Sequence, residues 1–290
     1  MKSLAIAKIL LPVDFSEQSA AAARQAKALA CHFHSELTLL HVMTPMRYEF
    51  SGLELGGPVL AEMYTNCAEQ LRKELKDSLA CELKDIETRR VVMEGEAARE
   101  IVHYTHTHGI GLIVMPTHGY GPFRRLLLGS VAAKVLHDAD CPVWTGAHLE
   151  EAPSTESISF RDIVCAVDLG PQSCKALEWA IGMQKEFGGR LTVVHATAGS
   201  QNTGHAEEGR RQLMESIVRE DLGRLMQRHG AQAELLIEQG DPPRVLCETA
   251  GALNAGLLVI GRGSAAGVIG RLRTNAYAII RQAPCPVLSV

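Results

Sequence analysis

Two stretches decide the fold of this protein: K-I-L-L-P-V-D-F-S at residues 8–16 and D-I-V-C-A-V-D-L-G at residues 162–170. Each is a short, nearly continuous apolar run that leads to an aspartate. Such a run, without polar alternation, is typical of a strand buried on both faces of a sheet. The two stretches lie 154 positions apart, which indicates an internal repeat.

The repeat extends over most of the chain. Residues 8–42 align with 162–196 without a gap, and A-D-C-P-V at 139–143 returns as A-P-C-P-V at 283–287. The segment between the copies, A-H-L-E-E-A-P-S-T-E-S-I-S, is polar and acidic, which suits an exposed linker. We therefore predict a first domain at 1–146, a linker at 147–159 and a second domain at 160–290.

Strand-like and helix-like patterns alternate outward from the first stretch. In the first copy the expected strands are 9–13, 37–42, 90–93, 112–115 and 142–145, and the expected helices are 16–33, 63–83, 97–108 and 130–138. This order predicts an α/β fold: a five-stranded parallel sheet with helices on both faces, present twice. Ligands of such sheets bind beyond the carboxyl ends of the strands, where the strand order reverses. Residues 43–62 are expected to form a loop over that place.

Composition excludes several classes of function. The net charge of −4 argues against a chain held on nucleic acid or on a membrane by positive charge, and aromatic residues make up only 4%. No long apolar segment predicts a membrane span, and the N-terminus does not resemble a signal peptide, so a cytoplasmic protein is expected. The eight cysteines form no C-x-x-C pair and are predicted to be reduced and mostly buried.

A glycine-containing loop follows the fourth expected strand, with the sequence P-T-H-G-Y-G-P-F-R-R-L-L-L-G-S at 116–130. Nine residues separate Gly119 from Gly129, and Ser130 then opens a helix, either as its N-cap or as a hydroxyl donor to a phosphate. Glycines let backbone N–H groups approach an anion, and a helix N-terminus favours negative charge. Asp14, at the end of the first strand, can accept ribose hydroxyls. Asp14 and Asp168 can equally cap the following helices, and the two roles are compatible.

These motifs, in this order and in both copies, resemble the universal stress protein family. The resemblance implies a Rossmann-like nucleotide-binding domain of the adenine nucleotide alpha hydrolase type. It also implies ATP binding in members that carry G-x2-G-x9-G-S/T. Carried onto this chain, it implicates the following residues of the first copy: Pro12, Val13, Asp14, Val42, Met115, Gly119, Gly129 and Ser130. Pro116 departs from the pattern, because it stands at the family's first glycine and has no N–H.

The second copy departs further from the pattern. Its loop reads G-R-G-S-A-A-G-V-I-G-R-L-R-T-N at 261–275, so that Arg273 stands where the first copy has Gly129. A side chain there would crowd a phosphate; alternatively, Arg271 and Arg273 pair with an anion. We predict a degenerate nucleotide site that contains Asp168, Gly261, Gly263, Arg273 and Thr274.

Histidines give weaker signals. His103, His106 and His108 have a metal-like spacing, but the aligned residues are Glu248, Gly251 and Leu253. We predict a solvated helix face, and no metal beyond a Mg²⁺ carried by a nucleotide. His41 and His195 occupy equivalent strand positions and are interpreted as hydrogen-bonded structural residues. No catalytic residue is expected.

The sequence thus predicts a tandem universal stress protein that binds ATP or a related adenine nucleotide. It would act in regulation through an unknown protein partner and not as an enzyme, although slow ATP hydrolysis stays open. The alternative, favoured by Pro116 and Arg273, is a pseudo-dimeric scaffold that binds no nucleotide or binds another small ligand. The last strands of the two copies are expected to pair as an internal pseudo-dimer, and a homodimer of the whole chain stays open.

Overall fold

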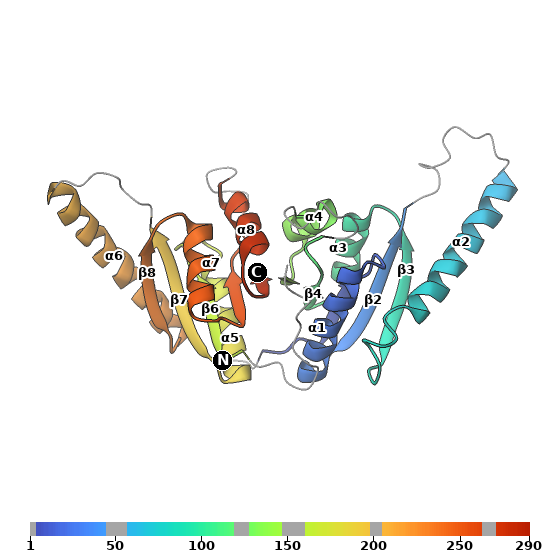
Figure 1. Cartoon of the computed structure of the whole chain (residues 1–290), viewed down its shortest axis with the longest axis horizontal. Coiled ribbons are helices and arrows are strands. Elements are labelled where there is room, and N and C mark those ends of the chain that lie inside the picture. The colour runs from blue at the N-terminus through green and yellow to red at the C-terminus, as the bar shows by residue number, and fades with distance from the viewer. Residues whose placement is uncertain (1–3, 45–56, 119–127, 147–159, 198–204, 263–270) are drawn as a thin grey trace. The chain divides into compact units, whose positions relative to one another are not determined.

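The computed structural model describes residues 4–44, 57–118, 128–146, 160–197, 205–262 and 271–290 (Figure 1). The chain divides into two compact units, built on Ala5–Trp144 and Ser159–Val290. Each unit is an α/β domain with a parallel sheet, which confirms the predicted tandem fold. The linker at 147–159 lies outside the described residues. The domain boundaries and the pairing of the last strands stay predictions.

The first copy contains five strands and four helices among its described residues. They are β1 (Lys8–Pro12), α1 (Glu17–Phe33), β2 (Glu36–Met43), α2 (Gly57–Asp77), β3 (Thr88–Glu94), α3 (Ala97–His108), β4 (Leu112–Val114), α4 (Ser130–Asp138) and β5 (Val143–Thr145). The sheet order is β3-β2-β1-β4-β5, and every pair is parallel. The order reverses between β1 and β4, which places a ligand site at their carboxyl ends.

The second copy repeats this topology. Its elements are β6 (Asp162–Ala166), α5 (Ser173–Phe187), β7 (Arg190–Thr197), α6 (His205–His229), β8 (Glu234–Gln239), α7 (Pro242–Ala252), β9 (Leu257–Ile260), α8 (Arg271–Gln282) and β10 (Val287–Ser289). The order β8-β7-β6-β9-β10 is again entirely parallel. The switch point therefore lies between β6 and β9.

The central strands of each copy are buried on both faces, as their apolar runs predicted. In β1, Leu10 and Leu11 are fully buried, and in β6 so are Val164 and Cys165. Helix α1 packs against the sheet through buried alanines, whose small side chains allow a close approach. This packing holds the strand ends, and hence the switch point, in fixed positions.

Helix α2 differs from its prediction. It was expected at 63–83 but spans Gly57–Asp77. The chain leaves the helix because Leu79 adopts a left-handed conformation, with φ of 59°, and Asp85 does the same further on. Part of the expected loop at 43–62 is therefore helical. The remainder, 45–56, lies outside the described residues, so a loop over the site stays a prediction.

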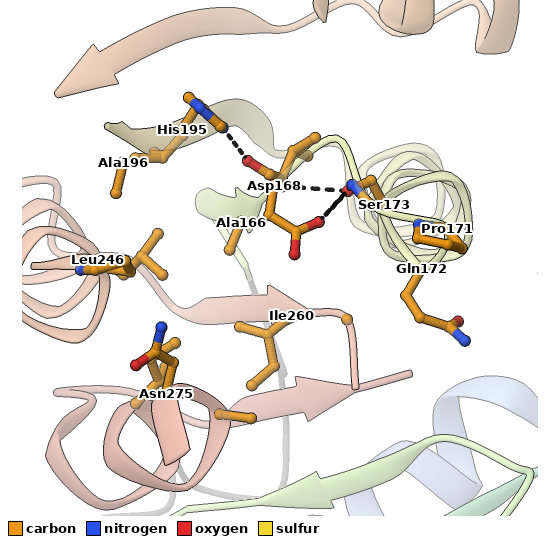
Figure 2. A pocket seen from close by; sticks show the side chains of 17 residues that line it. Ala166, Asp168, Pro171, Gln172, Ser173, His195, Ala196, Leu246, Ile260 and Asn275 are labelled. Carbon is orange, nitrogen blue, oxygen red and sulfur yellow. Dashed lines mark hydrogen bonds between the residues drawn. The ribbon is translucent and has the colours of Figure 1, made fainter. Parts of the chain in front are cut away.

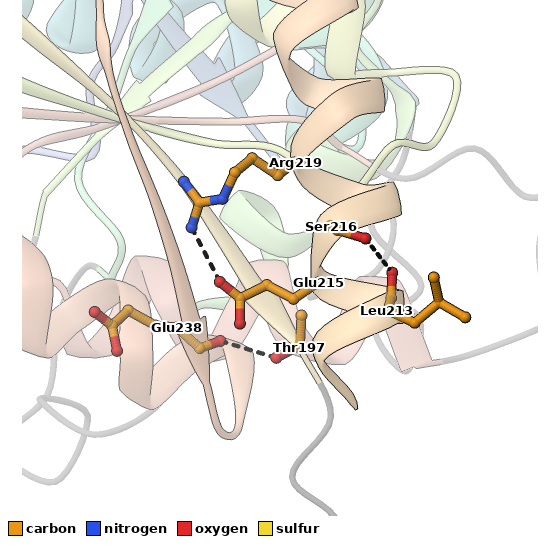
Figure 3. A network of polar contacts seen from close by, with 6 residues as sticks. All are labelled: Thr197, Leu213, Glu215, Ser216, Arg219 and Glu238. Atoms are coloured by element: carbon orange, nitrogen blue, oxygen red, sulfur yellow. Dashed lines mark hydrogen bonds and ion pairs between the residues drawn. The ribbon is translucent and has the colours of Figure 1, made fainter. Parts of the chain in front are cut away.

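Among the described side chains of helix α6, the fully buried one lies in its C-terminal half. Leu222 is fully buried, whereas Leu213 is 61% and Ile217 45% exposed. Local contacts support the exposed part: Arg219 pairs with Glu215 at 3.0 Å, one helical turn apart (Figure 3). Among the described residues, no helix combines the length and the apolar character needed to cross a membrane.

Candidate functional site

The first copy has a cavity of about 280 Å³ at the carboxyl ends of β1, β2 and β4. We call it the first cavity. It brings together seven residues that the sequence predicted: Pro12, Val13, Asp14, Val42, Met115, Gly129 and Ser130. The eighth, Gly119, lies outside the described residues. The structure thus gathers on one cavity residues that lie more than 100 positions apart in the chain.

Asp14 is held by the turn that leads into α1. Its Oδ1 accepts hydrogen bonds from the Ser16 N–H at 3.1 Å, the Ser16 hydroxyl at 2.5 Å and the Ser19 hydroxyl at 2.7 Å. Phe15, inside this turn, is left-handed with φ of 62°. Asp14 therefore orders the turn before α1, but it does not cap the helix as the sequence allowed, because Ser16 is the N-cap. Within the described part of the chain all three hydrogen bonds act on Oδ1, so Oδ2 is left to accept from a ligand.

The start of α4 forms the opposite side of the first cavity. Gly129 is the N-cap, not Ser130 as the sequence suggested, and its N–H donates to the Thr117 carbonyl at 2.8 Å. The next three residues, Ser130, Val131 and Ala132, all line the cavity. Their N–H groups belong to the first helical turn, which has no intrahelical acceptor for them. They provide a place for an anion.

Apolar side chains form the remaining wall of the first cavity. Met115 and Ile101 are buried, and Val42 is half-buried beside them. His41 donates from Nδ1 to the Val13 carbonyl at 2.8 Å, because a carbonyl can only accept. The equivalent Nδ1 of His195 lies 2.6 Å from the Val167 carbonyl. Both histidines are therefore hydrogen-bonded to the backbone, as the sequence predicted.

The second copy has an equivalent cavity of about 280 Å³, the second cavity, at the ends of β6, β7 and β9 (Figure 2). Asp168 Oδ1 accepts from the Gly170 N–H and the Ser173 hydroxyl, each at 2.8 Å. Of the residues predicted here, Asp168 and Gly261 line the cavity. Gly263 lies outside the described residues. Arg273 and Thr274 lie in the first turns of α8, and their side chains are outside the description.

Helix α8 starts earlier than its counterpart α4. Aligned by the A-x-C-P-V segments, Ser130 corresponds to Thr274, but α8 already begins at Arg271. Thr274 therefore does not open the helix as Ser130 does. The cavity-lining residues Asn275 and Ala276 fall inside the helix, where their N–H groups have intrahelical acceptors.

Sequence reasoning missed several residues of both cavities. Ile101 and His118 line the first cavity, and Leu246 and Asn275 line the second. The missed residues occupy equivalent positions of the repeat, since Ile101 aligns with Leu246 and Val131 with Asn275. None of them belongs to the motif that pointed to the site, so a match between the copies did not by itself mark them as lining a cavity.

The histidines of α3 lie on a largely solvated face, as predicted. His103 and His106 are exposed, and His106 Nε2 lies 3.5 Å from Asp140 Oδ2. His108 stacks on Tyr104, with ring centroids 3.8 Å apart.

The prediction of mostly buried cysteines is wrong. All eight are free thiols, but only Cys165 and Cys285 are buried, whereas Cys31 and Cys81 are exposed. The exposed pair lies near helix ends, where an apolar residue type does not guarantee burial.

Comparisons with known proteins agree with this architecture. The universal stress protein family model matches residues 5–145 and 159–290. A universal stress protein of Mycolicibacterium smegmatis is 26% identical over 297 aligned residues, covering 97% of this chain and 96% of that protein. One from Methanocaldococcus jannaschii is 31% identical over 136 residues, covering 47% of this chain and 79% of that protein.

A solved structure shows the same fold along the whole chain. The crystal structure of a universal stress protein from Archaeoglobus fulgidus superimposes with a TM-score of 0.66 at 23% identity. The match covers 98% of this chain and 96% of that one. With two matched domains and a tandem α/β fold, the chain belongs to the universal stress protein family.

Proposed function

We propose that the first copy binds ATP or a related adenine nucleotide in the first cavity. One observation carries the proposal: Asp14 and the first-turn residues of α4, whose N–H groups have no acceptor within the helix, line the same cavity. The carboxylate suits ribose hydroxyls, and the N–H groups suit phosphate oxygens. The two groups lie on different elements, so the site exists only in the folded domain.

The walls of the cavity support a specific orientation. Val42, Met115 and Ile101 offer apolar contacts to a flat heterocycle beside the end of β2. A cavity of about 280 Å³ is small among ligand pockets, which run from about 300 to 1,000 Å³. It suits the nucleoside part and leaves the phosphates at the rim, where α4 begins. A Mg²⁺ ion in this site would arrive bound to the phosphates.

The biological role that follows is regulatory. Occupancy of the cavity would join the β1 end to the start of α4 and change the surface offered to a protein partner. The sequence has no Walker-type Lys-Thr pair, so efficient ATP hydrolysis is not part of the proposal.

The test begins with the purified chain. The protein is denatured, the supernatant is separated by chromatography, and released nucleotide is identified by its absorbance ratio and retention. Nucleotide-free protein is then titrated with ATP by calorimetry, with inorganic tripolyphosphate as the control for phosphate alone. We expect ATP to bind and tripolyphosphate to bind more weakly. A folded chain that binds no adenine nucleotide would overturn the proposal.

Pro116 favours a second candidate function. It lines the first cavity at the position where the ATP-binding pattern has glycine, and proline offers no N–H. On this basis the chain would be a pseudo-dimeric scaffold or would bind a different small ligand. The Pro116→Gly variant separates the two candidates. If the parent fails to bind ATP and the variant binds it, the scaffold function is the correct one.

A further inference from the structure

We propose that the second cavity binds a nucleoside, an uncharged ligand without phosphates. This inference rests on the nucleotide site proposed for the first copy, and it assigns the second copy a different ligand class. Two differences between the two cavities carry it: the backbone at the start of α8 and the side chain of Asn275.

The backbone difference removes a place for phosphates. In the first cavity, the lining residues Ser130 and Val131 are the first two residues of α4 and have unpaired N–H groups. In the second cavity, the lining residues Asn275 and Ala276 are the fifth and sixth residues of α8. Their N–H groups are bonded within the helix. The same wall therefore changes from an anion site to a neutral surface.

The side-chain difference adds a neutral polar group. Asn275 replaces Val131, and its carboxamide faces the cavity opposite Asp168 (Figure 2). Among the residues that the structure describes, Asn275 has no side-chain hydrogen-bond partner. A carboxamide both donates and accepts, which suits the mixed donor and acceptor edge of a nucleobase.

The charge of the second cavity matches that of the first, whose one charged lining residue among those described is Asp14. Among the described lining residues of the second cavity, Asp168 is the one formal charge, and it is negative. Its Oδ1 is held by Gly170 and Ser173, and its other oxygen points into the cavity (Figure 2). As proposed for Asp14 in the first cavity, this carboxylate can accept hydrogen bonds from the vicinal hydroxyls of a ribose.

Apolar contacts complete the match to a nucleoside. Leu246, Ile260 and Ile279 line the cavity and offer a surface for a flat ring. The backbone of Gly261 lies close to Gln172: a Cβ added to Gly261 would be only 3.0 Å from the Gln172 Cβ. At about 280 Å³, the second cavity has the same volume as the first and suits the nucleoside part of a ligand.

The experiment uses the full chain with the first cavity disabled by Asp14→Asn together with Gly129→Arg. Adenosine, guanosine, uridine, AMP and ATP are each titrated by calorimetry. We expect at least one nucleoside to bind, and its 5′-phosphates to bind about tenfold or more weakly. Tighter binding of AMP or ATP would overturn the inference and would favour an anion site formed by Arg271 and Arg273.

Two further variants locate the ligand. Asn275→Val introduces the residue that the first cavity has at the aligned position. It should weaken nucleoside binding about tenfold or more, because the hydrogen bonds of one amide are lost. Asp168→Asn should remove the preference for the nucleoside over its 2′,3′-dideoxy form. If a folded chain binds no nucleoside, or if neither Asn275→Val nor Asp168→Asn changes binding, the inference is refuted.

The same titrations distinguish this inference from the proposed function. If the unmodified chain binds ATP and Asp14→Asn weakens that binding, the result tests the first cavity alone. If the chain with the disabled first cavity still binds a nucleoside, and Asp168→Asn weakens that binding, the result tests the second cavity alone. Each result can fail without the other.

Discussion

Replacing Gly129 with arginine should abolish ATP binding while leaving the first domain folded. Gly129 has φ of −63° and ψ of 148°, a conformation open to all L-amino acids. A Cβ added there would lie 3.4 Å from the Thr117 oxygen and 3.5 Å from the His118 Cα, which are ordinary contacts. The fold therefore does not require glycine at this position.

The expected effect on stability is small. Losing glycine restricts the unfolded chain and stabilises the native state by about 0.4–1 kcal/mol. A poorer N-cap residue costs a similar amount. The two contributions nearly cancel, so the free energy of unfolding should change by less than about 1 kcal/mol. Thermal unfolding of the variant checks this value.

The expected effect on binding is large. Gly129 lines the first cavity beside the N–H groups of Ser130 and Val131, so a long side chain there competes with phosphates for the same space. Each lost hydrogen bond to a charged group costs about 1.5–3 kcal/mol. Loss of two gives at least about 3 kcal/mol, or more than 100-fold in affinity. Calorimetric titration with ATP measures the loss.

Matched variants separate size from charge. Gly129→Leu adds bulk without charge and should weaken ATP binding as strongly as Gly129→Arg does. Both variants should reduce the affinity for adenosine less than the affinity for ATP. If Gly129→Arg stays folded and binds ATP like the parent, the phosphates lie elsewhere and the assignment of the α4 start is wrong.

Three further predictions concern single residues. Asp14→Asn should weaken ATP binding about tenfold or more, and Asp168→Asn should weaken it less. Calorimetric titration with ATP measures both affinities, and equal effects would contradict the assignment. Leu169 is left-handed, with φ of 62°, and 40% exposed, so Leu169→Gly should raise the free energy of unfolding by about 1 kcal/mol in chemical denaturation. Burial raises the pKa of the Cys165 thiol to about 12, so iodoacetamide at pH 8 should modify the exposed Cys31 and leave Cys165 intact, as mass spectrometry of the folded chain would show.

The overall fold could be predicted because the repeat and the apolar runs are local and occur twice. A strand such as β1, apolar at successive positions, can be buried only inside a parallel sheet covered by helices. The carboxyl ends of parallel strands then meet at one edge of the sheet. For this reason Asp14, at the end of the first strand, could be assigned to a ligand site from the residues, and the family resemblance added Val42 and Met115; all three line one cavity.

The starts of α3 and α4 could be predicted from the sequence, but the residue that caps α4 and the start of α8 could not. Gly129 rather than Ser130 caps α4 because the Gly129 N–H donates to the Thr117 carbonyl, twelve residues earlier in the chain. The start of α8 moved by three residues although the aligned loops have similar spacing. The sequence thus determined that each copy places an aspartate at its switch point. Only the tertiary structure decided which backbone N–H groups face each cavity, because it sets where each helix begins relative to the strand ends.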